Sequence, residues 1–228
     1  MARLARVVAP GLPHHVTQRG NRRQQTFFCD EDYRSYLELM VEWSGAHQVE
    51  IWAYCLMPNH VHLIAVPHSA VGLRRAIGEV HRRYTRMVNF REGWRGHLWQ
   101  GRFASCVLDE PYLLTAARYV PVRAGLIHAP SRYRWSSAAA HVRGRDDALV
   151  RVAPLTKRVA NWRGFLARAI REEDIQTLRA HERTGRPLGE EEFLATLEHE
   201  LGRILRRQKP GPKRSHPTRR TPKRTPMS

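Results

Sequence analysis

Two histidines, His60 and His62, are spaced two residues apart in an apolar segment that reads NHVHLIAV. Side chains alternate between the two faces of a β-strand, so both imidazoles point to the same side. Two neighbouring imidazoles can chelate one divalent ion, and such an ion can polarise the oxygens of a phosphodiester. The pattern is short, and the chain has 13 histidines. A sheet face that carries two histidines by chance is therefore the alternative.

Tyrosine is the side chain that could attack a phosphate held by such an ion. A helix is predicted to begin after Asp109 and Pro111, and it carries Tyr112 and Tyr119 seven residues apart, on nearly the same face. A phenol with a pKa near 10 is a weak nucleophile unless an ion stabilises the charge that develops on the phosphate. Spacing alone does not choose between the two tyrosines, and each can equally be a packing residue.

The elements that must position these residues follow from hydrophobic periodicity. Strands are expected over 13–19, 49–56, 60–66 and 104–108, and helices over 31–46, 72–90 and from 110 to about 119. The order β-α-β-β-α-β predicts an α+β fold. It is the ferredoxin-like split βαβ arrangement, an antiparallel sheet with helices on one face.

Three regions are expected along the chain. Residues 1–150 form the ferredoxin-like domain, and within them 126–150 read as irregular. Residues 151–207 form a helical C-terminal extension, with helices over 161–182 and 190–207. Residues 208–228 combine proline with positive charge and are expected to be a disordered basic tail.

Composition points to a polyanionic partner. The 228 residues carry a formal net charge of +18, and only four of the 39 basic residues are lysines. Arginine binds phosphate oxygens in pairs and stacks on bases, although a GC-rich genome would also favour it.

No apolar run approaches the ~20 residues of a membrane helix, and the N-terminus has no apolar signal region. Three scattered cysteines fit a reduced cytoplasm.

Seven arginines are candidate phosphate contacts. They lie in the first loop, on one face of the helix predicted over 72–90, and in a Gly/Trp-rich loop that follows it: Arg19, Arg22, Arg23, Arg82, Arg83, Arg86 and Arg102. The helical set can also be an ordinary solvated face, whereas loops carry function more often.

Taken together, several segments resemble the REP-associated tyrosine transposases of the single-tyrosine HUH transposase superfamily. The matches are GLPHHVTQRGNRR at 11–23, EIWAYCLMPNHVHLIAVP at 50–67, HRRYTR at 81–86, GHLWQGRF at 96–103, EPYL at 110–113, ARYV at 117–120, PVRAGL at 121–126, YRWSSA at 133–138 and TGRPLG at 184–189.

The resemblance assigns roles to individual residues. It implies that His60 and His62 hold a divalent ion, Mg²⁺ or Mn²⁺, and that Tyr119 is the nucleophile. It also implies that the substrate is single-stranded DNA with hairpin-forming repeats. Such DNA is cleaved and rejoined through a 5′-phosphotyrosine intermediate, in a bacterial cytoplasm and in association with the nucleoid.

The chain departs from the family pattern directly after Tyr119. In the family an asparagine one helical turn later completes the metal site, whereas here three residues, including that asparagine, are missing. Arg123 stands four residues after Tyr119 and cannot ligate a metal. We therefore expect impaired or absent strand cleavage with DNA binding retained, unless Asn59, Gln18 or water fills the position.

Two further expectations complete the interpretation. Pro121 disfavours helical geometry in the residue before it, so the helix is expected to fray at Val120 or earlier. The main functional alternative is a non-catalytic DNA-binding protein derived from a transposase. An RNA-binding sheet would place aromatics where His60 and His62 stand, and a plain metallohydrolase would not need Tyr119.

Overall fold

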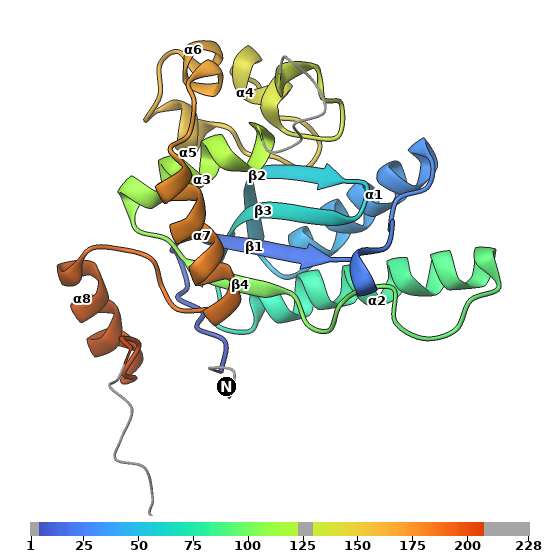
Figure 1. The fold of residues 1–228 in the computed structure, drawn as a ribbon, viewed down its shortest axis with the longest axis horizontal. Helices are drawn as coiled ribbons and strands as arrows, with labels where there is room; N and C mark the ends of the chain where they lie inside the picture. Colours follow the sequence, from blue (N-terminus) through green and yellow to red (C-terminus); the bar gives the residue numbers. More distant parts are fainter. Residues whose placement is uncertain (1–4, 123–129, 208–228) are drawn as a thin grey trace, which may run out of the picture.

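A four-stranded antiparallel sheet organises the computed structural model, which describes residues 5–122 and 130–207 (Figure 1). Its strand order is β2-β3-β1-β4. The strands are β1 His14–Arg19, β2 Val49–Met57, β3 His60–Pro67 and β4 Ala104–Val107. This is the split βαβ order that the periodicity predicts, and the α+β fold class is confirmed.

The mostly apolar composition of β3 suits its central position in the sheet. All eight of its residues are buried, as expected for a strand that is covered on both faces. A two-residue turn, Pro58 and Asn59, joins it to β2, so that Met57 pairs with His60. The tight turn fixes the register of β3 and hence the face to which each histidine points.

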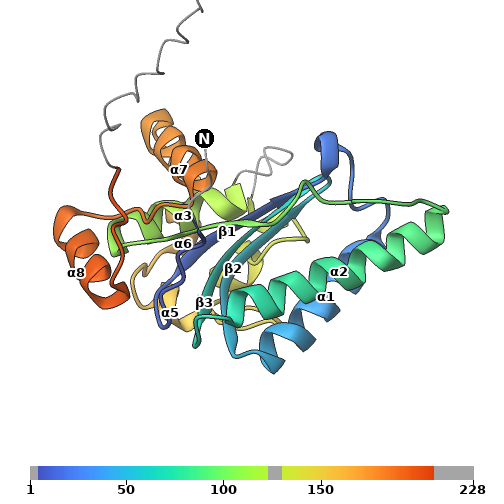
Figure 2. The same ribbon diagram turned by 90° about the horizontal axis from the view of Figure 1, so that it is seen from below.

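Two long helices cover one face of the sheet. α1 (Asp30–Ala46) and α2 (Gly72–Glu92) lie side by side beneath it in Figure 2. The buried residues of α2 recur every three or four positions, among them Leu73, Ile77, Val80, Tyr84 and Val88. The pair matches the helices expected on one face.

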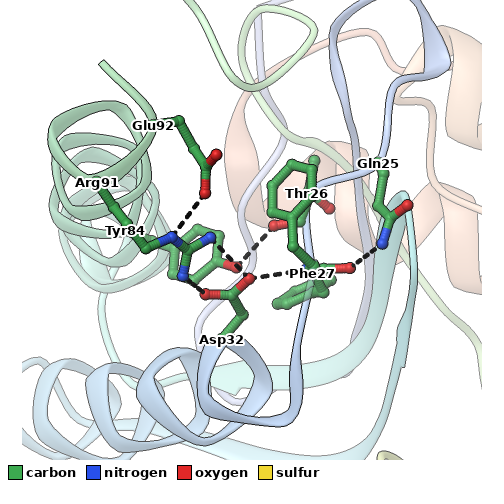
Figure 3. A network of polar contacts seen from close by, with 8 residues as sticks. Gln25, Thr26, Phe27, Asp32, Tyr84, Arg91 and Glu92 are labelled. Atoms are coloured by element: carbon green, nitrogen blue, oxygen red, sulfur yellow. Dashed lines mark hydrogen bonds and ion pairs between the residues drawn. The ribbon is translucent and has the colours of Figure 1, made fainter. Parts of the chain in front are cut away.

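A polar network ties the ends of these two helices together (Figure 3). The buried carboxylate of Asp32 on α1 forms an ion pair with Arg91 on α2 and accepts the backbone N–H of Phe28 at 2.7 Å. The Tyr84 hydroxyl donates to the carbonyl of Thr26 at 2.7 Å. Both contacts hold the segment before α1 against the end of α2.

The opposite face is covered as well, which the periodicity did not reveal. α3 (Glu110–Val122) contacts β2 and β3, and α7 (Glu172–Thr184) contacts β1 and β4 (Figure 2). The expected fraying at Val120 is wrong, because α3 continues through Pro121 to Val122. Tyr119 and Val120 are both buried, and this packing outweighs the unfavourable position before proline.

The remaining helices belong to the C-terminal half, and there are two short 3₁₀ turns, one directly after β1 and one after α3. The helices are α4 Ala138–Arg143, α5 Ala153–Thr156, α6 Trp162–Ala167 and α8 Glu191–Leu201, and the turns are η1 Asn21–Arg23 and η2 Pro130–Arg132. The helix expected over 161–182 is therefore two helices, α6 and α7, separated at the extended residue Arg168. The last helix ends at Leu201, where Gly202 adopts a left-handed conformation.

The hydrophobic core runs across the expected domain boundary at residue 150. Leu178 of α7 and Leu188 belong to the same buried cluster as strand residues such as Leu63. The division into 1–150 and 151–207 remains a prediction, and the tail 208–228 lies outside the described residues. Among the described helices, none has the length and apolar character needed to span a bilayer.

Candidate DNA and metal site

The two histidines of β3 point to the face covered by α3 and α7. In the antiparallel pair of β1 and β3, Thr17 stands opposite His62 and Arg19 opposite His60. The centroids of the two imidazole rings are 5.0 Å apart. His60 is 7% exposed and His62 is 2% exposed. The arrangement therefore places two nitrogen ligands side by side.

Asn59 orients the His60 ring. Nδ1 of His60 lies 2.6 Å from Oδ1 of Asn59, and Nδ2 of Asn59 donates to the carbonyl of Arg23 at 3.1 Å. An amide oxygen only accepts, so the His60 proton is on Nδ1 and the lone pair is on Nε2. Asn59, considered above as a replacement ligand, thus acts as a hydrogen-bond partner of the first histidine.

A third histidine joins the pair, and sequence reasoning did not assign it. Nε2 of His15 on β1 lies 3.1 Å from Nδ1 of His62, and the two rings stack with centroids 5.3 Å apart. Glu182 on α7 places Oε1 3.5 Å from Nδ1 of His15. The closest ligand atoms of His15, His62 and Glu182 all lie within 4.8 Å of one another. The alternation of side chains along β1 could have indicated His15, but no local signal in the sequence indicates Glu182.

α3 places Tyr119 against these histidines. Its ring meets His62 edge-on at 5.8 Å between centroids and His15 edge-on at 6.2 Å. Tyr119 is 3% exposed, whereas Tyr112, about two helical turns earlier, is only partly buried at the edge of the core. Of the two candidate tyrosines, the structure brings Tyr119 into contact with the imidazoles.

An open hollow of about 440 Å³ lies beside the histidines. Its lining residues come from β1, β3, the loop before β4 and α7: Thr17, Gln18, Arg19, His60, His62, Gln100, Gly101, Arg102, Ala104, Glu182 and Arg183. Burial, followed by the charge of Arg23, lowers the pKa of Arg19 from its usual value. Gln18, the other suggested ligand, donates its amide to the carbonyl of Gly101 at 3.1 Å. Cations therefore flank the histidines where a phosphate could enter.

The predicted arginines fall into two groups. Arg19 and Arg102 line the hollow, and Arg22 and Arg23 lie in η1 directly after β1. Gly20 permits that tight turn, because a Cβ there would lie 2.2 Å from the carbonyl oxygen of Gln24.

The arginines of α2 are on the other side of the sheet from the hollow. Arg82 and Arg83 both pair with Glu79, and Arg83 also lies over the ring of Trp43. Arg86 is exposed on the same helix. The structure does not bring these three together with the histidines.

Comparison with known proteins finds a family model that matches the N-terminal part of the chain. Residues 10–122 match the family model described as Transposase IS200 like. No curated protein matches the chain. The segment that carries the sheet, both histidines and Tyr119 is thus similar to the IS200-like transposases.

A solved structure supports the same fold. A REP-associated tyrosine transposase bound to a REP hairpin is similar, with a TM-score of 0.50 and 20% identity, over 66% of this chain and 92% of that chain. A second similar structure is a “putative transposase” from Deinococcus radiodurans, with a TM-score of 0.38 and 19% identity, over 52% of this chain and 95% of that one. The fold of the chain is therefore that of a REP-associated tyrosine transposase, as the motifs indicate.

Proposed function

We propose that the protein cleaves and rejoins single-stranded DNA by tyrosine transesterification. The Tyr119 oxygen attacks the phosphorus, the P–O3′ bond breaks, and the leaving oxygen takes a proton to become a free 3′-OH. The protein then carries a 5′-phosphotyrosine, and attack by a 3′-OH reverses the step. The observation that carries this proposal is the edge-on contact of Tyr119 with His62, a histidine that itself lines a hollow flanked by arginines.

His60 and His62 would hold the divalent ion, Mg²⁺ or Mn²⁺. Their rings are adjacent on one sheet face, and the Nδ1 atom of each is engaged with a neighbouring side chain. The donor set fits a divalent ion because it offers two adjacent imidazoles beside an open hollow that leaves room for further ligands. When bound, the ion supplies positive charge to the phosphate oxygens, which a phenol needs in order to attack.

Arginines would position the DNA. Arg19 and Arg102 flank the histidines, so they contact the phosphates next to the reacting one, and Arg22 and Arg23 extend this surface along η1. One similar protein is bound to a REP hairpin. We propose hairpin-forming single-stranded repeats as the substrate of this chain and place it with the REP-associated type.

A DNA-binding protein without cleavage activity is the second candidate. Tyr119 is 3% exposed, so a DNA strand cannot reach its hydroxyl without a rearrangement of the groups around it. The resemblance also implies that an asparagine one turn after Tyr119 is missing; the position holds Arg123, which lies outside the described residues. Both points favour a protein that retains DNA binding but has reduced strand cleavage.

A covalent-adduct assay distinguishes the two candidates. The protein is incubated with end-labelled hairpin-bearing single strands and Mn²⁺ or Mg²⁺, and the products are separated on a denaturing gel. We expect a protein–DNA adduct that disappears in Tyr119→Phe and persists in Tyr112→Phe, a matched control on the same helix. Hairpin binding without any adduct in either metal would overturn the cleavage proposal and leave the binding protein.

A further inference from the structure

Three side chains from three elements form a line that ends at the proposed metal ligand His62. Glu182 of α7 approaches Nδ1 of His15 on β1 at 3.5 Å, and Nε2 of His15 approaches Nδ1 of His62 on β3 at 3.1 Å. His15 is 0% exposed and the Glu182 side chain is 17% exposed. Electrostatic interactions in so enclosed a setting are weakly screened by water.

The position of Glu182 is set by the packing of α7. Leu178 lies one helical turn earlier on the same face and is fully buried in the core. After α7, Gly185 adopts a left-handed conformation, and Leu188 then forms a bridge with Leu108, donating its N–H to Val107 at 2.8 Å. Both ends of the segment are thereby attached to the sheet, so Glu182 is held facing β1.

The chemistry of the groups sets the direction of hydrogen-bond donation between these three side chains. A carboxylate only accepts, so it favours the proton of His15 on Nδ1. Nε2 of His15 then accepts the Nδ1 proton of His62, and the His62 lone pair is on Nε2. Asn59 sets the same tautomer in His60, so both histidines present the same nitrogen.

We propose that Glu182 and His15 form a relay that positions His62 for the metal, and that neither of them is itself a ligand. His15 lies behind His62: His60, His62 and Glu182 line the hollow, whereas His15 is not among its lining residues. A hydrogen bond from the second nitrogen of a ligating histidine fixes its ring and raises its basicity. Because the chain lacks the family asparagine, binding would depend strongly on the two remaining imidazoles. This inference rests on the proposed metal site at His60 and His62.

The first test measures metal affinity with Mn²⁺ alone, by calorimetry or electron paramagnetic resonance. We expect Glu182→Gln and His15→Leu to weaken Mn²⁺ binding about 10- to 100-fold. His15→Gln should restore most of the affinity, because its amide oxygen can accept the His62 proton. Glu173→Gln, an exposed change on the same helix, is the control. Unchanged affinity in Glu182→Gln would overturn the relay, and this isosteric change at a partly exposed residue remains informative even if His15→Leu does not fold.

The second test separates positioning from direct ligation. The visible spectrum of Co²⁺-loaded protein reports the ligand set, and we expect the saturated spectra of wild type and Glu182→Gln to coincide. A spectrum that shows a lost oxygen ligand would overturn the relay, because Glu182 would then bind the ion itself.

The third test needs no metal. Nitrogen chemical shifts of the histidine rings in the metal-free protein report the tautomers, and we expect His62 to carry its proton on Nδ1 in wild type. Glu182→Gln should increase the fraction of the other tautomer. An unshifted tautomer would overturn the relay, whereas the expected tautomers in a protein that binds no Mn²⁺ would overturn only the proposed metal site.

Discussion

The two faces of the sheet both bury histidines, but they use them differently. On the side of α1 and α2, the ring nitrogen of His81 is 2.9 Å from the Tyr36 hydroxyl. His14, which alternates away from His15, lies 2.8 Å from the carbonyl of Leu12. On the other side, His62 lies against both His15 and His60, and His60 and His62 line a hollow. Burial of a histidine is therefore no sign of function, whereas convergence of several rings is.

Charged side chains also have different surroundings on the two faces of the sheet. Beneath the sheet, Asp32 and Arg91 neutralise each other and join α1 to α2. Above it, Arg19, Arg102 and Glu182 line an open space. The paired charges between α1 and α2 hold the two helices together, and under the proposed function the charges around the hollow would meet the DNA.

The largest expected difference between the faces concerns the tyrosines. Tyr119→Phe should abolish the covalent DNA adduct and lower the cleavage rate more than about 10³-fold, since it removes the attacking oxygen. Tyr36→Phe, which changes a hydroxyl on the opposite face, should leave adduct formation intact while lowering stability. Single-turnover cleavage of a labelled hairpin strand checks both. An adduct in Tyr119→Phe would assign the nucleophile to another residue.

A matched pair of histidine variants comes next. His62→Gln should weaken Mn²⁺ binding and slow cleavage at least about 100-fold, because a metal ligand is lost. His14→Gln should keep metal affinity and lower only the free energy of unfolding, because its ring bonds to the backbone of Leu12 and Ala9. Calorimetric titration and urea denaturation measure the two effects. Equal losses of metal affinity would erase the distinction between the faces.

The α1–α2 network should affect stability alone. Arg91→Met leaves the buried Asp32 carboxylate without its cation and should lower the free energy of unfolding by about 1.5–3 kcal/mol. Arg95→Met, an exposed change just beyond α2, is the control and should lower it by less than about 0.5 kcal/mol. Urea denaturation gives the values. A loss of hairpin binding in Arg91→Met at unchanged fold would place this network in the DNA interface.

The core histidines should make stability depend on pH. Burial, with a further contribution from Arg6, lowers the pKa of His81 from 6.5 to about 3, and burial lowers that of His14 to about 4. Their stabilising effect is complete above about pH 6.5. It is lost as the pH falls toward the folded-state values, because the unfolded chain takes up protons that the folded one resists. Urea denaturation should show less loss in His81→Gln than in wild type between about pH 7 and about pH 5. Parallel curves would contradict the assignment.

The smallest expected effect compares arginines on the two faces. Arg102→Gln should reduce the salt dependence of single-stranded DNA binding by about 0.7 in the log–log slope, equivalent to one phosphate contact. Arg82→Gln should change it less, because Arg82 is paired with Glu79 on the α2 side. Fluorescence anisotropy at several salt concentrations gives both slopes. Equal reductions would show that DNA also contacts α2, as the sequence alone predicts.

Much of the fold was accessible from the sequence. Alternation in 13–19 and 60–66 and the three- to four-residue spacing in 72–90 predict β1, β3 and α2 closely. The break between α6 and α7 was missed, because it depends on the extended backbone at Arg168 rather than on a gap in the apolar pattern. The helical end of α3 was also missed, because buried neighbours override the local preference of a proline.

The sequence by itself determined that His60 and His62 share a side, because that follows from the two-residue repeat of any strand. Only the tertiary structure decided that His15 and Glu182 join them. His15 lies 47 residues from His62 and is aligned with β3 by strand pairing, and Glu182 comes from a helix that packs across the sheet through Leu178. Long-range register and helix docking depend on contacts between distant segments, which local patterns do not specify.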